Sequence, residues 1–88
     1  RAAAFPCSGE INRDVSDPRA LLRTVEAHYG LGATRLEHVD GLSVEFDDWR
    51  FNLRMSNTEP VVRLNVETRG DVALMQQKTE ELLAMIDR

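Results

Sequence analysis

Apolar and polar residues alternate along much of this chain, which is the pattern of β-strands that bury one face and expose the other. In residues 62–68, for example, every second residue is apolar over most of the segment. Alternation of this kind predicts strands over residues 9–15, 34–39, 42–46, 49–54 and 62–68. Asp40-Gly41 links the second of these strands to the third, and such a pair favours a tight hairpin turn.

Two further segments carry apolar residues at the spacing of an amphipathic helix. The first begins at Asp17-Pro18, because aspartate caps helix N-termini and proline fits the first helical turn. We expect it to end at Gly30 and Gly32 in the left-handed conformation that closes many helices. The second helix follows Asp71. The stripes expected to face the sheet are Leu22, Val25 and Tyr29 in the first helix, and Val72, Met75, Thr79, Leu82 and Ile86 in the second.

Elements in this order predict an α+β fold, a two-layer sandwich in which a mostly antiparallel sheet carries two helices on one face. The chain has 88 residues, of which 42% are hydrophobic, and this is enough for one small core. We therefore expect residues 1–88 to form a single domain. The other face of the sheet should be polar and meet solvent or a partner domain.

The charge balance narrows the classes of partner. Fifteen acidic residues outnumber eleven basic ones, and the net charge of −4 argues against binding to nucleic acid or to an anionic membrane. No apolar stretch approaches the roughly 20 residues that span a bilayer. Cys7 is the only cysteine, so no internal disulfide forms, which fits a reducing compartment. We expect a cytoplasmic protein.

One segment between the last two strands concentrates hydrogen-bond donors suited to an anion. It runs from Arg54 to Pro60 and is followed by Arg63, so two forked guanidiniums bracket a turn of small polar residues. Turns of this composition can also aim successive backbone N–H groups into one concavity. The candidate site residues are Arg54, Ser56, Asn57, Thr58 and Arg63.

Strand alternation places Arg54 and Arg63 on the same polar face at the mouth of this turn. Two simpler interpretations stay open on the sequence alone. The turn could be an ordinary surface loop, and the arginines could form cross-strand pairs with Glu45 or Glu67 that have no function.

No pattern of catalytic or metal-binding residues accompanies this segment. Neighbouring Asp47 and Asp48 point to opposite sides of an extended chain, so they make a poor acid–base pair. His28 and His38 stand apart from any motif with metal-ligand spacing. We therefore predict no catalytic residue and no metal or other cofactor within this chain.

Residues 49–67, from the strand that starts at Trp49 through the donor-rich turn, resemble the C-terminal domain of the α-D-phosphohexomutases, and most of all the bacterial phosphomannomutases. Residues 8–12 and the closing helix resemble segments at comparable places in that domain. Asn57 favours the phosphomannomutase or dual phosphomannomutase/phosphoglucomutase branch, since glucosamine-phosphate mutases tend to have glycine there.

The resemblance implies the last of four domains, with a fold similar to that of the TATA-binding protein and a loop that grips the substrate phosphate distant from the reacting one. Arg54, Ser56, Asn57 and Thr58 match its binding positions, and Arg63 matches a supporting one. The implied enzyme is an isomerase that interconverts mannose 6-phosphate and mannose 1-phosphate, and possibly glucose phosphates, through a bisphosphorylated intermediate. Its implied partners are the hexose phosphate and the other domains of the parent enzyme.

The phosphoserine loop, the aspartate-rich magnesium loop and the sugar-recognition loop of such enzymes have no match in this chain. The resemblance therefore implies magnesium for the full-length enzyme only, and we expect the isolated chain to be inactive. The alternative hypothesis is a noncatalytic module that binds a protein or RNA through the polar sheet face, with Ser43, Glu45, Asn52 and Arg63.

Overall fold

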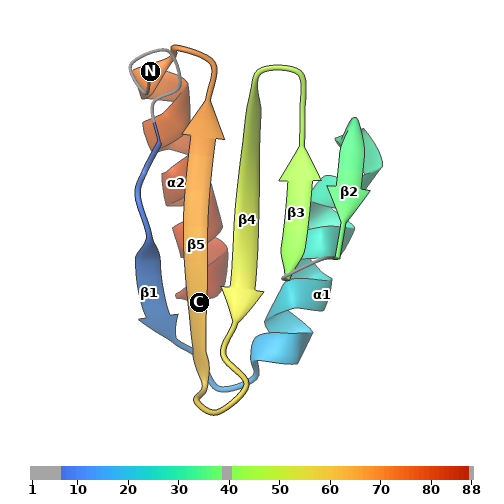
Figure 1. Ribbon diagram of the computed structural model, residues 1–88, viewed down its shortest axis with the longest axis vertical. Helices are drawn as coiled ribbons and strands as arrows, with labels where there is room; N and C mark the ends of the chain where they lie inside the picture. Colours follow the sequence, from blue (N-terminus) through green and yellow to red (C-terminus); the bar gives the residue numbers. More distant parts are fainter. Residues whose placement is uncertain (1–6, 39–40, 88) are drawn as a thin grey trace.

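The computed structural model describes residues 7–38 and 41–87, which form a five-stranded sheet with both long helices on one side (Figure 1). In chain order the elements are β1 (Ile11–Asp14), α1 (Pro18–Tyr29), the 3-10 helix η2 (Gly30–Gly32), β2 (Arg35–Glu37), β3 (Leu42–Glu45), β4 (Trp49–Met55), β5 (Val61–Thr68) and α2 (Val72–Ile86).

The strands lie in the order β1-β5-β4-β3-β2, and every neighbouring pair is antiparallel. The two longest strands, β4 and β5, form the centre of the sheet, while β1 and β2 form its edges (Figure 1). The chain passes from one edge to the other through α1, which lies behind the sheet. The predicted α+β fold, an antiparallel sheet with two helices on one face, is confirmed.

Alternation along the strands decides which face the helices cover. Buried and accessible residues alternate along β3, β4 and most of β5, with the apolar ones turned towards the helices. The sheet supplies Leu42, Val44, Trp49, Phe51, Leu53, Val62, Leu64 and Val66 to the core, and the helices supply Val25, Tyr29, Leu82 and Ile86. The opposite face of the sheet carries the polar residues and no described helix covers it.

Both helices begin where aspartate caps were predicted. The Asp17 carboxylate accepts a hydrogen bond from the Ala20 backbone N–H at 3.2 Å, and the Asp71 carboxylate accepts one from the Leu74 N–H at 2.9 Å. Each bond satisfies a backbone donor that has no partner within the helix. Neither described helix is long and apolar enough to cross a membrane.

The predicted left-handed end of the first helix is wrong. Gly30 has φ −63° and ψ −32°, which is right-handed, and its N–H still bonds to the Glu26 carbonyl. The Ala33 N–H then bonds to the Gly30 carbonyl at 3.3 Å, so the helix tightens into η2 before it ends. Positive φ values occur at Gly9, Gly41 and Gly70 instead.

Three smaller expectations differ from the structure. The strand predicted over 9–15 spans only Ile11–Asp14. Val72, which was expected to face the sheet, is 53% exposed. It is the first residue of α2, so only the residues that follow it in the helix can shield it. The strand predicted over 34–39 is shorter, Arg35–Glu37, and pairs with β3 as a hairpin would. The predicted Asp40-Gly41 turn lies partly outside the described residues.

Candidate anion-binding site

The two arginines of the donor-rich segment lie directly opposite each other. Along the β4–β5 ladder Arg54 pairs in register with Arg63, and both side chains stand exposed on the face away from the helices. Like charges at directly opposed positions of an antiparallel pair repel each other. Met55 and Val62 form the next and last pair before residues 56–60, which we call the β4–β5 loop.

Backbone N–H groups in this loop converge on one oxygen. The Thr58 and Glu59 N–H groups both donate to the Ser56 hydroxyl, at 3.2 and 3.3 Å. The loop is closed below them by the Ser56 N–H, which donates to the Val61 carbonyl at 3.0 Å. These bonds fold residues 56–59 into a compact turn around the serine hydroxyl.

The remaining predicted donors lie at the tip of the same loop. Asn57 and Thr58 are exposed, and the Thr58 hydroxyl lies 3.4 Å from the Ser56 hydroxyl. All five candidate residues therefore gather at one end of the β4–β5 hairpin, as the sequence predicted. What the structure adds is the register of the two arginines and the convergence of the N–H groups.

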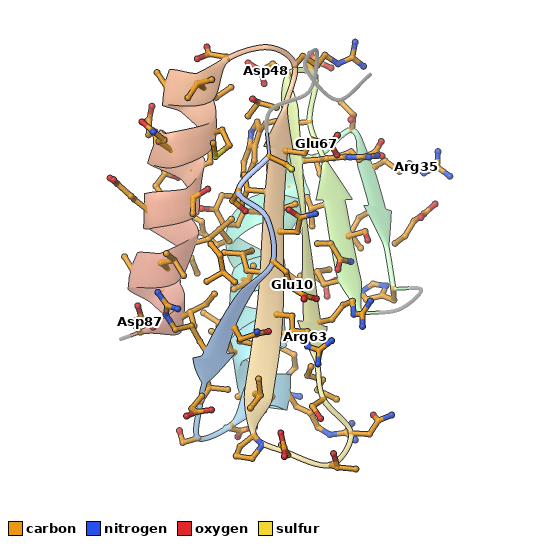
Figure 2. All side chains as sticks on the ribbon, turned by 60° about the vertical axis from the view of Figure 1, so that its left-hand side comes forward. Glu10, Arg35, Asp48, Arg63, Glu67 and Asp87 are labelled. Atoms are coloured by element: carbon orange, nitrogen blue, oxygen red, sulfur yellow. The ribbon has the colours of Figure 1, made fainter. Side chains whose placement is uncertain are left out.

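Among the described residues, Arg63 has one weak ionic partner. Its Nη1 lies 3.7 Å from Glu10 Oε2, and both side chains are more than half exposed. Figure 2 shows this pair on the side of the sheet away from α2, above the β4–β5 loop. An exposed pair at this distance contributes at most about 1 kcal/mol to stability. Arg63 can therefore release the Glu10 carboxylate in favour of an anion that binds it more tightly.

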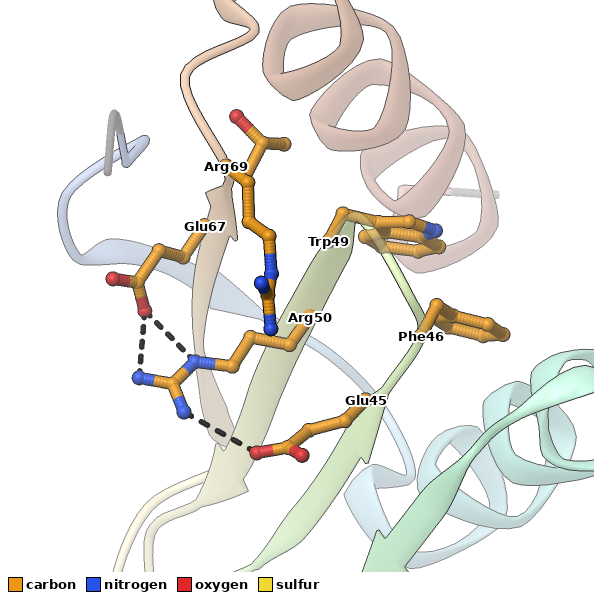
Figure 3. A pocket seen from close by; sticks show the side chains of 7 residues that line it. Glu45, Phe46, Trp49, Arg50, Glu67 and Arg69 are labelled. Atoms are coloured by element: carbon orange, nitrogen blue, oxygen red, sulfur yellow. Dashed lines mark hydrogen bonds and ion pairs between the residues drawn. The ribbon is translucent and has the colours of Figure 1, made fainter. Parts of the chain in front are cut away.

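Glu45 and Glu67, the two carboxylates that the sequence offered as cross-strand partners of these arginines, are engaged elsewhere. Arg50 bonds to Glu67 at 2.8 Å and to Glu45 at 3.3 Å, so one guanidinium joins three neighbouring strands (Figure 3). The hydrogen bond to Glu67 is the largest of the effects that raise the pKa of Arg50. Among residues 7–38 and 41–87, no ion pair involves Arg54. The proposed pairing of Arg54 or Arg63 with Glu45 or Glu67 is absent.

A hollow on the surface lies away from this loop, at the other end of β4. It measures about 330 Å³ and includes Trp49, Arg50, Thr68 and Arg69 (Figure 3). Since β4 has seven residues, this hollow lies roughly 20 Å from the β4–β5 loop. Within it Arg50 is paired with Glu45 and Glu67, which leaves Arg69 as its other guanidinium.

Acidic and histidine side chains do not assemble a metal site in the described part of the chain. There, no group of three or more His, Cys, Asp or Glu residues lies close enough to hold an ion. His38 instead contacts Glu26 at 2.9 Å on the surface. The residues present therefore do not fit the magnesium site that the resemblance implies for the full-length enzyme.

Comparisons with known proteins give the family. Residues 10–84 match the model described as "Phosphoglucomutase/phosphomannomutase, C-terminal domain". The chain is 57% identical over 88 residues to a phosphomannomutase of Salmonella typhimurium, covering 100% of this chain and 19% of that protein. It is 56% identical to a protein named "Phosphohexose mutases" of Xanthomonas campestris pv. campestris, covering 93% of this chain and 18% of that one.

A crystal structure of a phosphoglucomutase/phosphomannomutase family protein from Burkholderia thailandensis has the same fold. The TM-score is 0.65 at 28% identity, over 93% of this chain and 18% of that one. The chain belongs to the phosphoglucomutase/phosphomannomutase family and corresponds to its C-terminal domain, which confirms the resemblance. It spans about a fifth of the length of the curated relatives it matches. The comparisons do not favour the alternative of a protein- or RNA-binding module.

Sequence reasoning missed one neighbour of this site. Gly41 was assigned only to a turn, whereas the structure places it against the backbone and side chain of Arg54. The Asp-Gly pair signals a turn, but only the pairing of β3 with β4 shows which side chain that glycine touches.

Proposed function

We propose that this chain is the substrate-phosphate-binding domain of a phosphomannomutase, and that the β4–β5 loop with Arg54 and Arg63 holds the nonreacting phosphate of a hexose phosphate. The observation that carries the proposal is the register of the two arginines. Without a ligand, the two opposed guanidiniums repel each other. A phosphate dianion between them would offset this repulsion and accept a charge-assisted hydrogen bond from each. The Ser56 hydroxyl, which accepts from the Thr58 and Glu59 N–H groups, supplies a neutral donor beside them.

Ser56, Asn57 and Thr58 complete the proposed site. The Ser56 hydroxyl now accepts both N–H bonds, and it can turn its own proton towards a phosphate oxygen. Asn57 and Thr58 are exposed at the loop tip, where an amide and a hydroxyl can donate to the remaining oxygens. The site lies on an open surface, so it would form one wall of a cleft that other domains of the parent enzyme complete.

The role we assign to this domain is positional. Gripping one phosphate holds the sugar so that its other end faces the reacting group, which converts binding energy into orientation. In the interconversion of mannose 6-phosphate and mannose 1-phosphate, and of the corresponding glucose phosphates, the loop must accept either phosphate in turn. The bisphosphorylated intermediate has to reorient between the two half-reactions, and hinge motion of this domain would permit that.

Chemistry itself is assigned to the rest of the parent enzyme. Magnesium there would neutralise developing charge on the transferred phosphoryl group, while the residues of this chain only bind and orient. The isolated chain should therefore be inactive. A hexose phosphate substrate and a single cysteine fit the cytoplasm, which we retain as the proposed location.

Titration of the 88-residue chain with mannose 6-phosphate, followed by backbone amide NMR, tests the site. We expect shifts in residues 54–63 with a dissociation constant on the order of millimolar, near −4 kcal/mol, because one wall of a cleft binds weakly. Mannose 1-phosphate should shift the same amides. Arg54→Ala should remove the shifts and leave the fold intact, since this side chain is exposed.

Arg69→Ala is the matched control, because Arg69 is also exposed but lies at the opposite end of the sheet. It should leave the titration unchanged. Absence of shifts in the β4–β5 loop at saturating sugar phosphate, together with broad shifts of Ser43, Glu45 and Asn52 on adding RNA, would favour the interaction module instead. Unfolding of Arg54→Ala would show that Arg54 has a structural role.

A further inference from the structure

Gly41 lies beside the proposed site on the strand next to β4. In the β3–β4 ladder Leu42 pairs with Leu53, so Gly41, one residue earlier, stands level with Arg54. Arg54 is thus flanked by Gly41 on one side and by Arg63 on the other. Gly41 also has φ +96°, a conformation that residues with a side chain rarely adopt.

There is no room for a side chain at this position. A Cβ atom on Gly41 would lie 2.7 Å from the Leu53 carbonyl oxygen, 2.8 Å from Arg54 Cγ and 2.9 Å from Arg54 Cα. Real Cβ atoms essentially never approach other heavy atoms this closely, and these atoms belong to the backbone or to the base of a side chain. Any substitution would therefore displace the stem of Arg54.

We propose that Gly41 is a positioning residue for phosphate binding: its missing side chain leaves the space in which the stem of Arg54 lies, and this directs the guanidinium towards the anion that it shares with Arg63. The inference rests on the proposed function. Arginine has many rotamers, and affinity falls when a long side chain must be ordered during binding. Close packing of the stem against the Gly41 backbone, which a side chain at position 41 would prevent, orders the stem before the ligand arrives.

The alternative is that Gly41 serves only the backbone conformation of a turn. Gly9 separates the two explanations, because it also has positive φ, +76°, yet a Cβ built there meets nothing within 4 Å. Gly9→Ala therefore introduces backbone strain without a contact, whereas Gly41→Ala introduces both. The difference between the two variants reports the contacts with the Leu53 carbonyl and with Arg54.

The test measures affinity of the 88-residue chain for mannose 6-phosphate from the amide shifts of Thr58 and Glu59. Gly41→Ala should weaken binding at least about fivefold, while Gly9→Ala should change it less than about twofold. Unchanged affinity in Gly41→Ala would overturn the proposal.

A second measurement keeps this inference separable from the proposed function. Without ligand, the Arg54 Nε–Hε resonance should shift in Gly41→Ala and stay in place in Gly9→Ala. If wild type shows no phosphate-induced shifts, the proposed function fails, and this resonance still decides whether Gly41 positions Arg54. If Gly41→Ala does not fold, nuclear Overhauser contacts between Gly41 Hα and Arg54 Hγ in the wild-type chain decide instead, and their absence would refute the contact.

Discussion

At the scale of single residues, the β4–β5 hairpin opposes two like charges, an arrangement that fits the proposed binding role better than local stability. Arg54 of β4 lies directly opposite Arg63 of the adjacent strand β5, and the two like charges repel each other. The nearby Glu45 and Glu67 both form ion pairs with Arg50 instead. Local rules of sheet stability would favour an opposite charge at one of the two positions. Departures of this kind from local consistency are expected at functional sites.

Substituting Arg63→Gln tests this arrangement. Without ligand the free energy of unfolding should change by less than about 0.5 kcal/mol, since relief of repulsion offsets loss of the exposed Glu10 pair. Mannose 6-phosphate at ten times its dissociation constant should stabilise the wild type by about 1.4 kcal/mol, and should stabilise the variant clearly less. Urea unfolding in matched ionic strength measures both values. Equal stabilisation of the two proteins would contradict the assignment of Arg63.

How much of this site the sequence predicted depends on the residue. Within a strand, side chains two residues apart share a face. Alternation along β4 and along β5 was therefore enough to place Arg54 and Arg63 on the polar face of the sheet. They could not show that Glu45 and Glu67 would both go to Arg50. That pairing follows from the register between β3, β4 and β5. The register cannot be read from the sequence of any one strand alone.

At the scale of elements, a few side chains join the two helices and the sheet. Tyr29, at the end of α1, donates its hydroxyl to Glu81 of α2 at 3.2 Å. Its ring meets Trp49 and Phe51 of β4 edge-on, with centroids 5.6 and 5.2 Å apart. Thr68, at the end of β5, donates to the Asp71 carbonyl at 2.8 Å and so connects the sheet to α2.

Stability should depend on pH through Tyr29. Burial, and then the negative charge of Glu81, raise the pKa of Tyr29 from 10.0 to about 12. The unfolded chain releases this proton near pH 10, whereas the folded chain keeps it until about pH 12, so this contribution is complete below pH 10 and is lost as the pH rises towards 12. We expect a loss on the order of 1 to 2 kcal/mol, allowing for partial solvent screening near Glu81.

Urea unfolding at several pH values between 8 and about 11.5 would measure this loss, with Tyr29→Phe as the control. The variant lacks the ionisable group, so its stability should fall less steeply over the same range, although it is less stable at neutral pH. Parallel pH profiles for the two proteins would show that Tyr29 does not titrate differently in the folded state.

At the scale of the whole molecule, one small core holds both layers together. Leu82 of α2 and Val25 of α1 are both fully buried against the sheet, so neither layer is stable without the other. The polar face has no comparable apolar surface, and its charged residues bond to one another across β3, β4 and β5. The proposed binding loop therefore belongs to a hairpin whose strands are anchored by the core behind it.

Leu82→Ala should cost about 2 to 5 kcal/mol, because it leaves a cavity in a core that the domain cannot easily refill. Leu31→Ala is the matched control: the same change at a residue that is 98% exposed should alter stability by less than about 0.5 kcal/mol. Chemical denaturation of both variants measures the difference. Similar losses in the two would place the core elsewhere than around Leu82.

The sequence by itself determined the faces of the strands, the starts of both helices, the α+β class and the family, because alternation, capping and motif similarity are properties of short segments. It misjudged the end of α1, where continuing hydrogen bonds outweighed the tendency of glycine to reverse handedness. Only the tertiary structure decided that Arg54 stands between Gly41 and Arg63 while Arg50 takes both glutamates. Those contacts depend on the register between separate strands, which is set when the whole core packs.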